Sequence, residues 1–153
     1  MADRHSEALE AAISALRRKE RTTAEMVQWL GRRGYGSDQV QAAVDALNEI
    51  GELDDARFAR AYAEDKRELR GWGAERIGEE LTARGVAPEL IEAALEGDTD
   101  AAEVERAERL LALRDRPIAE EGDRVRALGF LARRGYGLEV AYEAIRRASR
   151  RAA

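Results

Sequence analysis

The same five residues, Arg-Arg-Gly-Tyr-Gly, occur at 32–36 and again at 133–137, and a looser copy, Arg-Gly-Val-Ala, occupies 84–87. The first glycine of each copy is Gly34, Gly85 or Gly135, so the copies are 51 and 50 residues apart. A regular period of this length is typical of stacked units with the same secondary structure. The sequence therefore predicts a chain of tandem repeats.

Each of these glycines follows a leucine by four residues and precedes an apolar residue. Helices often end on a glycine, because a residue without a Cβ adopts the left-handed backbone conformation without a clash. In this type of ending, the leucine packs against the residue that follows the glycine. Each copy therefore predicts the end of one helix, and Ser37, Pro88 and Leu138 predict the prompt start of the next.

Strong helix formers dominate the chain, and it contains two prolines. No stretch shows the alternation of apolar and polar residues that is typical of strands. We therefore predict an all-α fold of three tandem three-helix repeats in an elongated, curved array. The expected repeats are 1–51, 52–97 and 98–153. The expected helices are 6–20, 22–33 and 37–50 in the first repeat, 54–70, 74–84 and 88–96 in the second, and 99–115, 121–134 and 138–151 in the third.

Within the long middle helix, Phe58, Ala61, Tyr62 and Leu69 follow helical spacing and are expected to form its apolar face. Asp54 stands immediately before this helix and is the residue type that caps a helix start.

The composition argues against several classes of function. The chain has no cysteine, and its one histidine, His5, lies near the N-terminus, where disorder is common. No apolar run reaches the roughly 18 residues that a membrane span needs. We therefore expect no catalytic site, no bound metal, no cofactor and a cytoplasmic location.

The net charge is −5, but residues 124–153 hold eight arginines against Glu139 and Glu143. Such a positive surface suits an acidic protein or a nucleic acid. The alternative is that these arginines only stabilise the negative end of the last helix, or are solvated. The candidate partner-binding residues are Arg133, Arg134, Arg146, Arg147, Arg150 and Arg151, together with an exposed set on the long helix, Arg57, Arg60, Arg67 and Arg70.

The middle repeat resembles the RecX family of bacterial regulatory proteins, and the outer repeats are similar to the first and third units of that family. The resemblance covers nearly the whole chain. The residues that carry it most specifically are Leu53-Asp54-Asp55, Arg57-Phe58-Ala59, Gly71 and Gly73, Arg76-Ile77, Glu80-Leu81 and Arg84-Gly85-Val86.

The resemblance implies tandem three-helix repeats and a protein that binds the RecA filament on DNA, mainly inhibiting its recombinase, ATPase and co-protease activities. It implies no catalytic residue and no cofactor. Two alternatives stay open: a helical-repeat adaptor for another protein, or a DNA-binding protein that uses the basic C-terminal repeat. Direct contact with single-stranded DNA is a further candidate interaction, and we expect a monomer.

Overall fold

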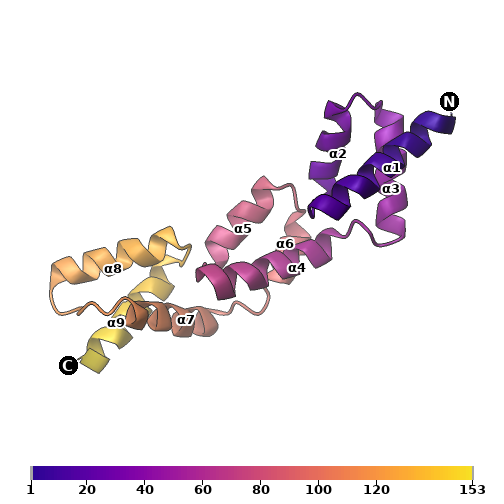
Figure 1. Cartoon of the computed structure of the whole chain (residues 1–153). Coiled ribbons are helices and arrows are strands. Elements are labelled where there is room, and N and C mark those ends of the chain that lie inside the picture. The colour runs from indigo at the N-terminus through magenta and orange to yellow at the C-terminus, as the bar shows by residue number, and fades with distance from the viewer. Residues whose placement is uncertain (1, 153) are drawn as a thin grey trace. The chain divides into compact units, whose positions relative to one another are not determined.

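The computed structural model describes residues 2–152, and within this range every regular element is a helix (Figure 1). The prediction of an all-α fold is therefore confirmed. Lys66–Arg70 forms a π-helical turn directly after α4. The α-helices are α1 (Ala2–Arg18), α2 (Thr23–Arg32), α3 (Ser37–Glu49), α4 (Asp55–Asp65), α5 (Ala74–Ala83), α6 (Pro88–Ala94), α7 (Asp100–Leu113), α8 (Glu121–Arg133) and α9 (Leu138–Ala152).

Two differences from the expected helices stand out. The first helix begins at Ala2, so His5 lies inside α1 and not in a disordered end. The long middle helix ends as an α-helix at Asp65, and the next turn is wound more loosely. A π-helical turn shifts the angular positions of its residues, so the spacing rule misplaces Leu69, which is 78% exposed. Ala61 is exposed as well. The repeat boundaries and the curved overall shape stay predictions.

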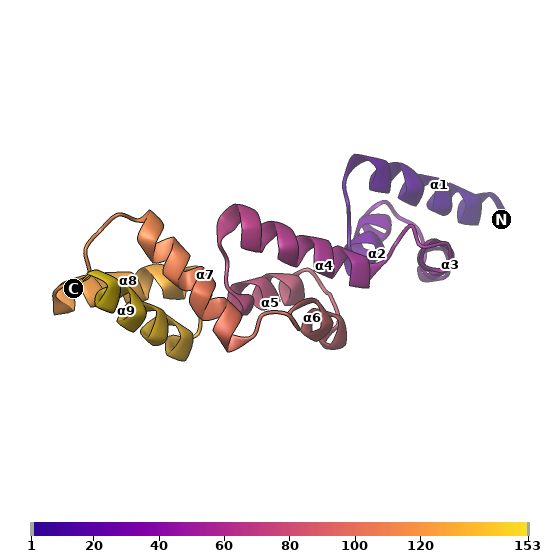
Figure 2. The same cartoon turned by 90° about the horizontal axis from the view of Figure 1, so that it is seen from below.

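The chain divides into two compact units, and the first contains residues up to 61 together with 81–91. In this unit α3 packs against both α1 and α2 (Figure 2). Ala8, Ala12 and Ala15 form the buried face of α1, and their small side chains let the neighbouring helices approach closely. The larger buried side chains of this core are Met26, Leu30, Val40, Val44, Leu47 and Leu53.

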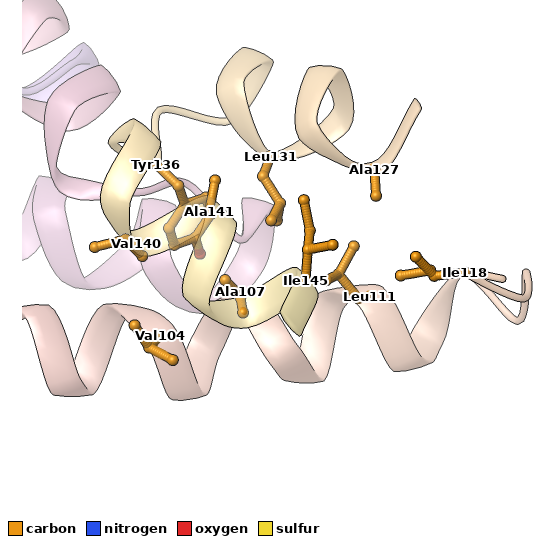
Figure 3. Packing of buried hydrophobic residues seen from close by; sticks show 11 residues of the cluster. Val104, Ala107, Leu111, Ile118, Ala127, Leu131, Tyr136, Val140, Ala141 and Ile145 are labelled. Carbon is orange, nitrogen blue, oxygen red and sulfur yellow. The ribbon is translucent and has the colours of Figure 1, made fainter. Parts of the chain in front are cut away.

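The second unit contains residues 62–80 and 92 onward. Here α9 packs against α7 and α8, and their apolar side chains converge on one core (Figure 3). Tyr136 is the largest fully buried side chain and follows directly after a repeated glycine. The other main members of the core are Val104, Leu111, Ile118, Leu131, Val140 and Ile145.

All three repeated glycines end helices in the predicted way. Gly34, Gly85 and Gly135 have φ values of 89°, 84° and 93°. In the third copy, the N–H of Tyr136 donates to the carbonyl of Leu131 at 3.1 Å, and the N–H of Gly135 donates to that of Ala132 at 3.0 Å. The same pair of hydrogen bonds closes the other two copies. The predicted helix-ending motif is therefore confirmed.

The second and third copies also receive the start of another helix. In the first unit, the hydroxyl of Thr22 at the start of α2 donates to the carbonyl of Arg84 at 2.7 Å. In the second unit, the N–H of Gly73 before α5 donates to the carbonyl of Arg134 at 2.7 Å. A Cβ on Gly85 would overlap with Ala24. These glycines are therefore required both for the backbone conformation and for the close approach.

We expect Gly34→Ala and Gly135→Ala to differ in stability. At Gly34 nothing lies within 4 Å of the added Cβ, so the left-handed backbone alone should cost about 1–2 kcal/mol. At Gly135 the Cβ would also overlap with the backbone of Arg76, which should raise the loss to about 2–4 kcal/mol. Urea unfolding of both variants measures the difference. Equal losses would contradict the role of close approach.

Candidate partner-binding surface

The arginines of α9 are partly neutralised by acids within the same unit. Arg147 donates from Nε to Glu143 at 2.9 Å and from Nη1 to Glu108 on α7 at 3.3 Å. Arg151 pairs with the other oxygen of Glu108 at 3.2 Å, and Arg146 pairs with Glu143. The positive charge counted along the sequence is therefore reduced by a carboxylate of α7. The fold brings that carboxylate to this face of α9.

Arg150 and Arg146 line a pocket of about 400 Å³ with Arg124, Tyr142 and Ser149. Tyr142 is exposed, whereas the hydroxyl oxygen of Ser149 is buried without a hydrogen-bond partner among the described residues. Arg150 is thus the member of the C-terminal set whose place in the structure best fits an exposed contact.

The long-helix arginines have different surroundings, each within its own unit. The guanidinium of Arg57 donates to the carbonyl of Gly51 at 2.9 Å, while its backbone N–H is capped by Asp54 at 3.0 Å. Arg57 therefore stabilises the end of α3 and the start of α4. Arg57, Arg60 and Arg70 are exposed, as predicted.

The expectation that Arg67 is exposed is wrong. Its side chain is 20% exposed and forms a two-point ion pair with Asp98, with Nε–Oδ1 at 2.7 Å and Nη2–Oδ2 at 2.5 Å. The same guanidinium donates to the carbonyl of Ala94 at 3.0 Å. Arg106 on α7 binds Asp98 from another direction at 3.0 Å. The Asp98 side chain is only 1% exposed, so this buried ion pair fixes the π-helical turn to the segment that precedes α7.

A second buried carboxylate continues this network. Glu103 accepts a hydrogen bond from the N–H of Ala74 at 3.0 Å and pairs with Arg106 at 3.4 Å. Burial raises the pKa of Glu103 in spite of these partners. Tyr136 donates to the carbonyl of Gly71 at 2.9 Å, and burial raises its pKa to about 12. The loop between α4 and α5 is therefore held from several sides by polar groups of the second unit.

Arg133 and Arg134 use their main chains for the fold. The carbonyl of Arg133 accepts from Arg76 Nη1 at 3.0 Å, and that of Arg134 accepts from Gly73. The Arg133 side chain is exposed, and the guanidinium of Arg134 stacks on Phe130 at 3.9 Å from the ring centroid. Both side chains are thus positioned by a turn whose backbone is fixed.

One feature that sequence reasoning missed is a cluster of aromatic rings and cations in the second unit. Arg76 lies 4.0 Å from the ring centroid of Trp72, and Lys66 lies 5.0 Å from Trp72 and 5.2 Å from Tyr62. The two rings meet edge to face at 6.5 Å. The π-helical turn places Lys66 between them. In the sequence, the glycines on either side of Trp72 indicate an unusual backbone at this point.

Two further properties concern the described part of the chain as a whole. Within residues 2–152, the side chains form no group of three potential ligands that could hold a metal ion. No helix in that range is both long and apolar enough to cross a membrane.

Comparison with known proteins identifies the family. Residues 8–47 match the family model described as RecX, first three-helix domain, and residues 54–95 match RecX, second three-helix domain. A regulatory protein RecX from Mycobacterium avium is 35% identical over 146 residues, covering 93% of this chain and 84% of the relative. The chain belongs to the RecX family. Further regulatory RecX proteins, from Thermobifida fusca and Halorhodospira halophila, are 35% and 39% identical over 94% and 83% of this chain and cover 80% and 79% of the relatives.

Solved RecX structures have the same fold. The crystal structure of RecX from Lactobacillus salivarius superposes with a TM-score of 0.87 at 22% identity, covering 97% of this chain and 98% of the other. A second crystal structure, of a regulatory protein RecX, gives a TM-score of 0.80 over 95% of this chain and 73% of the other. The resemblance found in the sequence is therefore confirmed.

We expect Asp98→Asn to destabilise the second unit by about 2–4 kcal/mol, because Arg67 and Arg106 would lose the carboxylate that balances their charges. Urea unfolding and hydrogen exchange of α7 measure this loss. Asp65→Asn changes an exposed carboxylate and should alter stability by less than about 0.5 kcal/mol. Similar losses of stability in the two variants would contradict the conclusion that the ion pairs of Asp98 stabilise the second unit.

The acid stability of the first unit should depend on Glu25. Burial tends to raise the pKa of this carboxyl, but hydrogen bonds and charge from Arg84, together with the N–H of Thr22, hold it below the usual value of 4.5. The ionised form is therefore favoured in the folded state. Its contribution is present above pH 4.5 and is lost as the pH falls through the lowered pKa. We expect Glu25→Gln to lose less stability on acidification than the wild type, as measured by melting temperature against pH. Glu20→Gln, an exposed control, should leave the profile unchanged.

Proposed function

We propose that this protein is a cytoplasmic regulator that binds the RecA filament on DNA and lowers its recombinase, ATPase and co-protease activities, and so acts in recombination, DNA repair and the SOS response. The observation that carries the proposal is the match to regulatory RecX proteins over 93% of the chain. It is supported by the helical repeats, which offer an extended set of side chains for many modest contacts along a filament. The protein would act without catalytic residues or a cofactor.

We propose that contact with the filament uses the arginines whose guanidinium groups remain exposed. Among the candidate arginines, these are Arg57, Arg60, Arg70, Arg133, Arg146, Arg147, Arg150 and Arg151. Arg67 contributes chiefly by binding the carbonyl of Ala94 and the carboxylate of Asp98. The guanidinium of Arg134 is held in place by stacking on Phe130. Exposed arginines at an interface mainly increase the rate of association and make it depend on salt.

The direct test mixes the purified protein with RecA, single-stranded DNA and ATP. We expect ATP hydrolysis, strand exchange and filament length all to fall when the protein is stoichiometric with RecA, because bound regulator limits filament growth or persistence. If all three stay at the level of RecA alone, the proposed function is wrong.

Two alternatives predict other results in the same set of assays. An adaptor for a different protein would fail to be retained on immobilised RecA. A DNA-binding protein would shift DNA in a gel in the absence of RecA, and the shift would disappear when Arg146, Arg147, Arg150 and Arg151 are replaced by Gln. The ion pairs of Arg147 and Arg151 with Glu108 reduce the charge available to phosphate and so disfavour this second alternative.

A further inference from the structure

The fold gathers a set of arginines from the end of α7, from α8 and from the turn that follows α8. We call it the arginine cluster: Arg114, Arg116, Arg126, Arg133 and Arg134. The guanidinium carbons of Arg114 and Arg134 lie 4.7 Å and 3.9 Å from the ring centroid of Phe130. Burial lowers the pKa of Arg114, and the charges of Arg116, Arg126, Arg134 and Arg133 lower it further, so each of these groups lies close enough to repel Arg114.

The spacing on α8 explains this arrangement. Arg126, Phe130 and Arg133 are separated by four and three residues and therefore share one face of the helix. Gly122 and Gly129 lie on α8 where the guanidinium groups fold back. Nη1 of Arg126 lies 3.5 Å from the position that a Cβ on Gly122 would take. Nη1 of Arg133 lies 3.0 Å from the corresponding position on Gly129. At the end of α7, Asp115 adopts a positive φ of 50°, which turns the chain between Arg114 and Arg116.

The arginine cluster is poorly balanced by acids. Arg126 pairs with Asp123 at 2.7 Å. Within residues 2–152, no carboxylate lies within 4.0 Å of the charged nitrogens of Arg114, Arg116, Arg133 or Arg134. Neighbouring like charges raise the free energy of the unbound surface, and a bound anion would relieve that repulsion.

A pocket of about 420 Å³ adjoins the arginine cluster and shares Arg116 with it. Its apolar lining comes from Leu111, Ala112, Pro117, Ile118 and Ala148. Two acids also line it, Glu108, which is already paired with Arg147 and Arg151, and Asp115. Leu113, next to the pocket-lining Ala112, is 81% exposed. A cationic site that can bind an anion thus lies beside a pocket that can hold an aliphatic side chain.

We propose that the arginine cluster and this pocket together bind a carboxylate-rich segment of a partner protein, with an aliphatic side chain of that segment seated in the pocket. Guanidinium groups stacked on Phe130 are held in place and present their N–H edges to carboxylates. The inference rests on the proposed function in that the segment would belong to the filament protein.

Two observations favour an acidic protein segment over nucleic acid. Phe130 is already stacked by two guanidinium groups, which compete with any unpaired base for this ring. The chain also carries a net charge of −5, and Glu120 and Glu121 stand at the start of α8, which opposes a long phosphate backbone more than a short peptide.

The test uses fluorescence anisotropy with three labelled probes: an acidic peptide containing two leucines, the same peptide with serines in their place, and an oligothymidylate of equal length. We expect the leucine peptide to bind best. Replacing Arg114, Arg116 and Arg134 together by Gln should weaken it about tenfold, or about 1.4 kcal/mol, because three partly solvated charge pairs would be lost. The matched control replaces the exposed Arg18, Arg32 and Arg109, removes the same charge and should leave binding unchanged.

A second variant, Ala112→Phe, narrows the pocket at an exposed position and should weaken only the leucine peptide. Circular dichroism of the triple variant and of Ala112→Phe tests whether each remains folded. Equal peptide affinities for the triple variant and its control would overturn the inference, and so would tighter binding of the oligothymidylate that the triple variant loses. Co-sedimentation with RecA filaments separates the two proposals. If the wild type binds the leucine peptide but does not co-sediment with RecA filaments, only the assigned partner is wrong. If the wild type inhibits RecA but the triple variant inhibits equally and keeps the peptide, only the arginine cluster is misassigned.

Discussion

Main-chain contact at a left-handed glycine is the constraint on which the rest of this structure depends. At Gly85 and Gly135 the backbone conformation ends one helix while the missing Cβ admits the first turn of another. The carbonyls that become free at the end of the helix are those that Thr22 and Gly73 bind. Helix ending and contact between helical segments that are distant in the sequence are therefore a single local arrangement, and both depend on the same residue type.

In the second unit, buried ion pairs and hydrogen bonds further stabilise this arrangement. Asp98 binds two arginines while almost fully buried, and Glu103 and Tyr136 hold the loop that contains Gly71. Buried charges of this kind stabilise a structure only when every partner is in place, so they favour one arrangement of the loop over others. The exposed side chains of this unit are consequently displayed on a well-defined backbone, which suits a surface that recognises a partner.

Local geometry explains which features could be predicted from the sequence. Leu30, Gly34 and Tyr35 lie within one helical turn and its exit, so their spacing alone predicts the helix ending. Arg67 and Asp98 are 31 residues apart, and Arg147 and Glu108 are 39 apart, so no periodic pattern relates them. The pairing of Arg147 and Arg151 with Glu108 could not be predicted for the same reason, because the carboxylate that they share lies on α7.

The contacts at Gly85 and Gly135 use carbonyl oxygens, an N–H and a hydroxyl, and little else that is specific to one position. Such an interface can be copied by duplicating a stretch of about 50 residues, because the copied segment carries both the accepting carbonyl before the glycine and the donating helix start. Chains with more or fewer repeats could therefore arise by duplication or deletion of whole repeats. Amino-acid substitutions elsewhere would then adapt the exposed face of each repeat to its own partner.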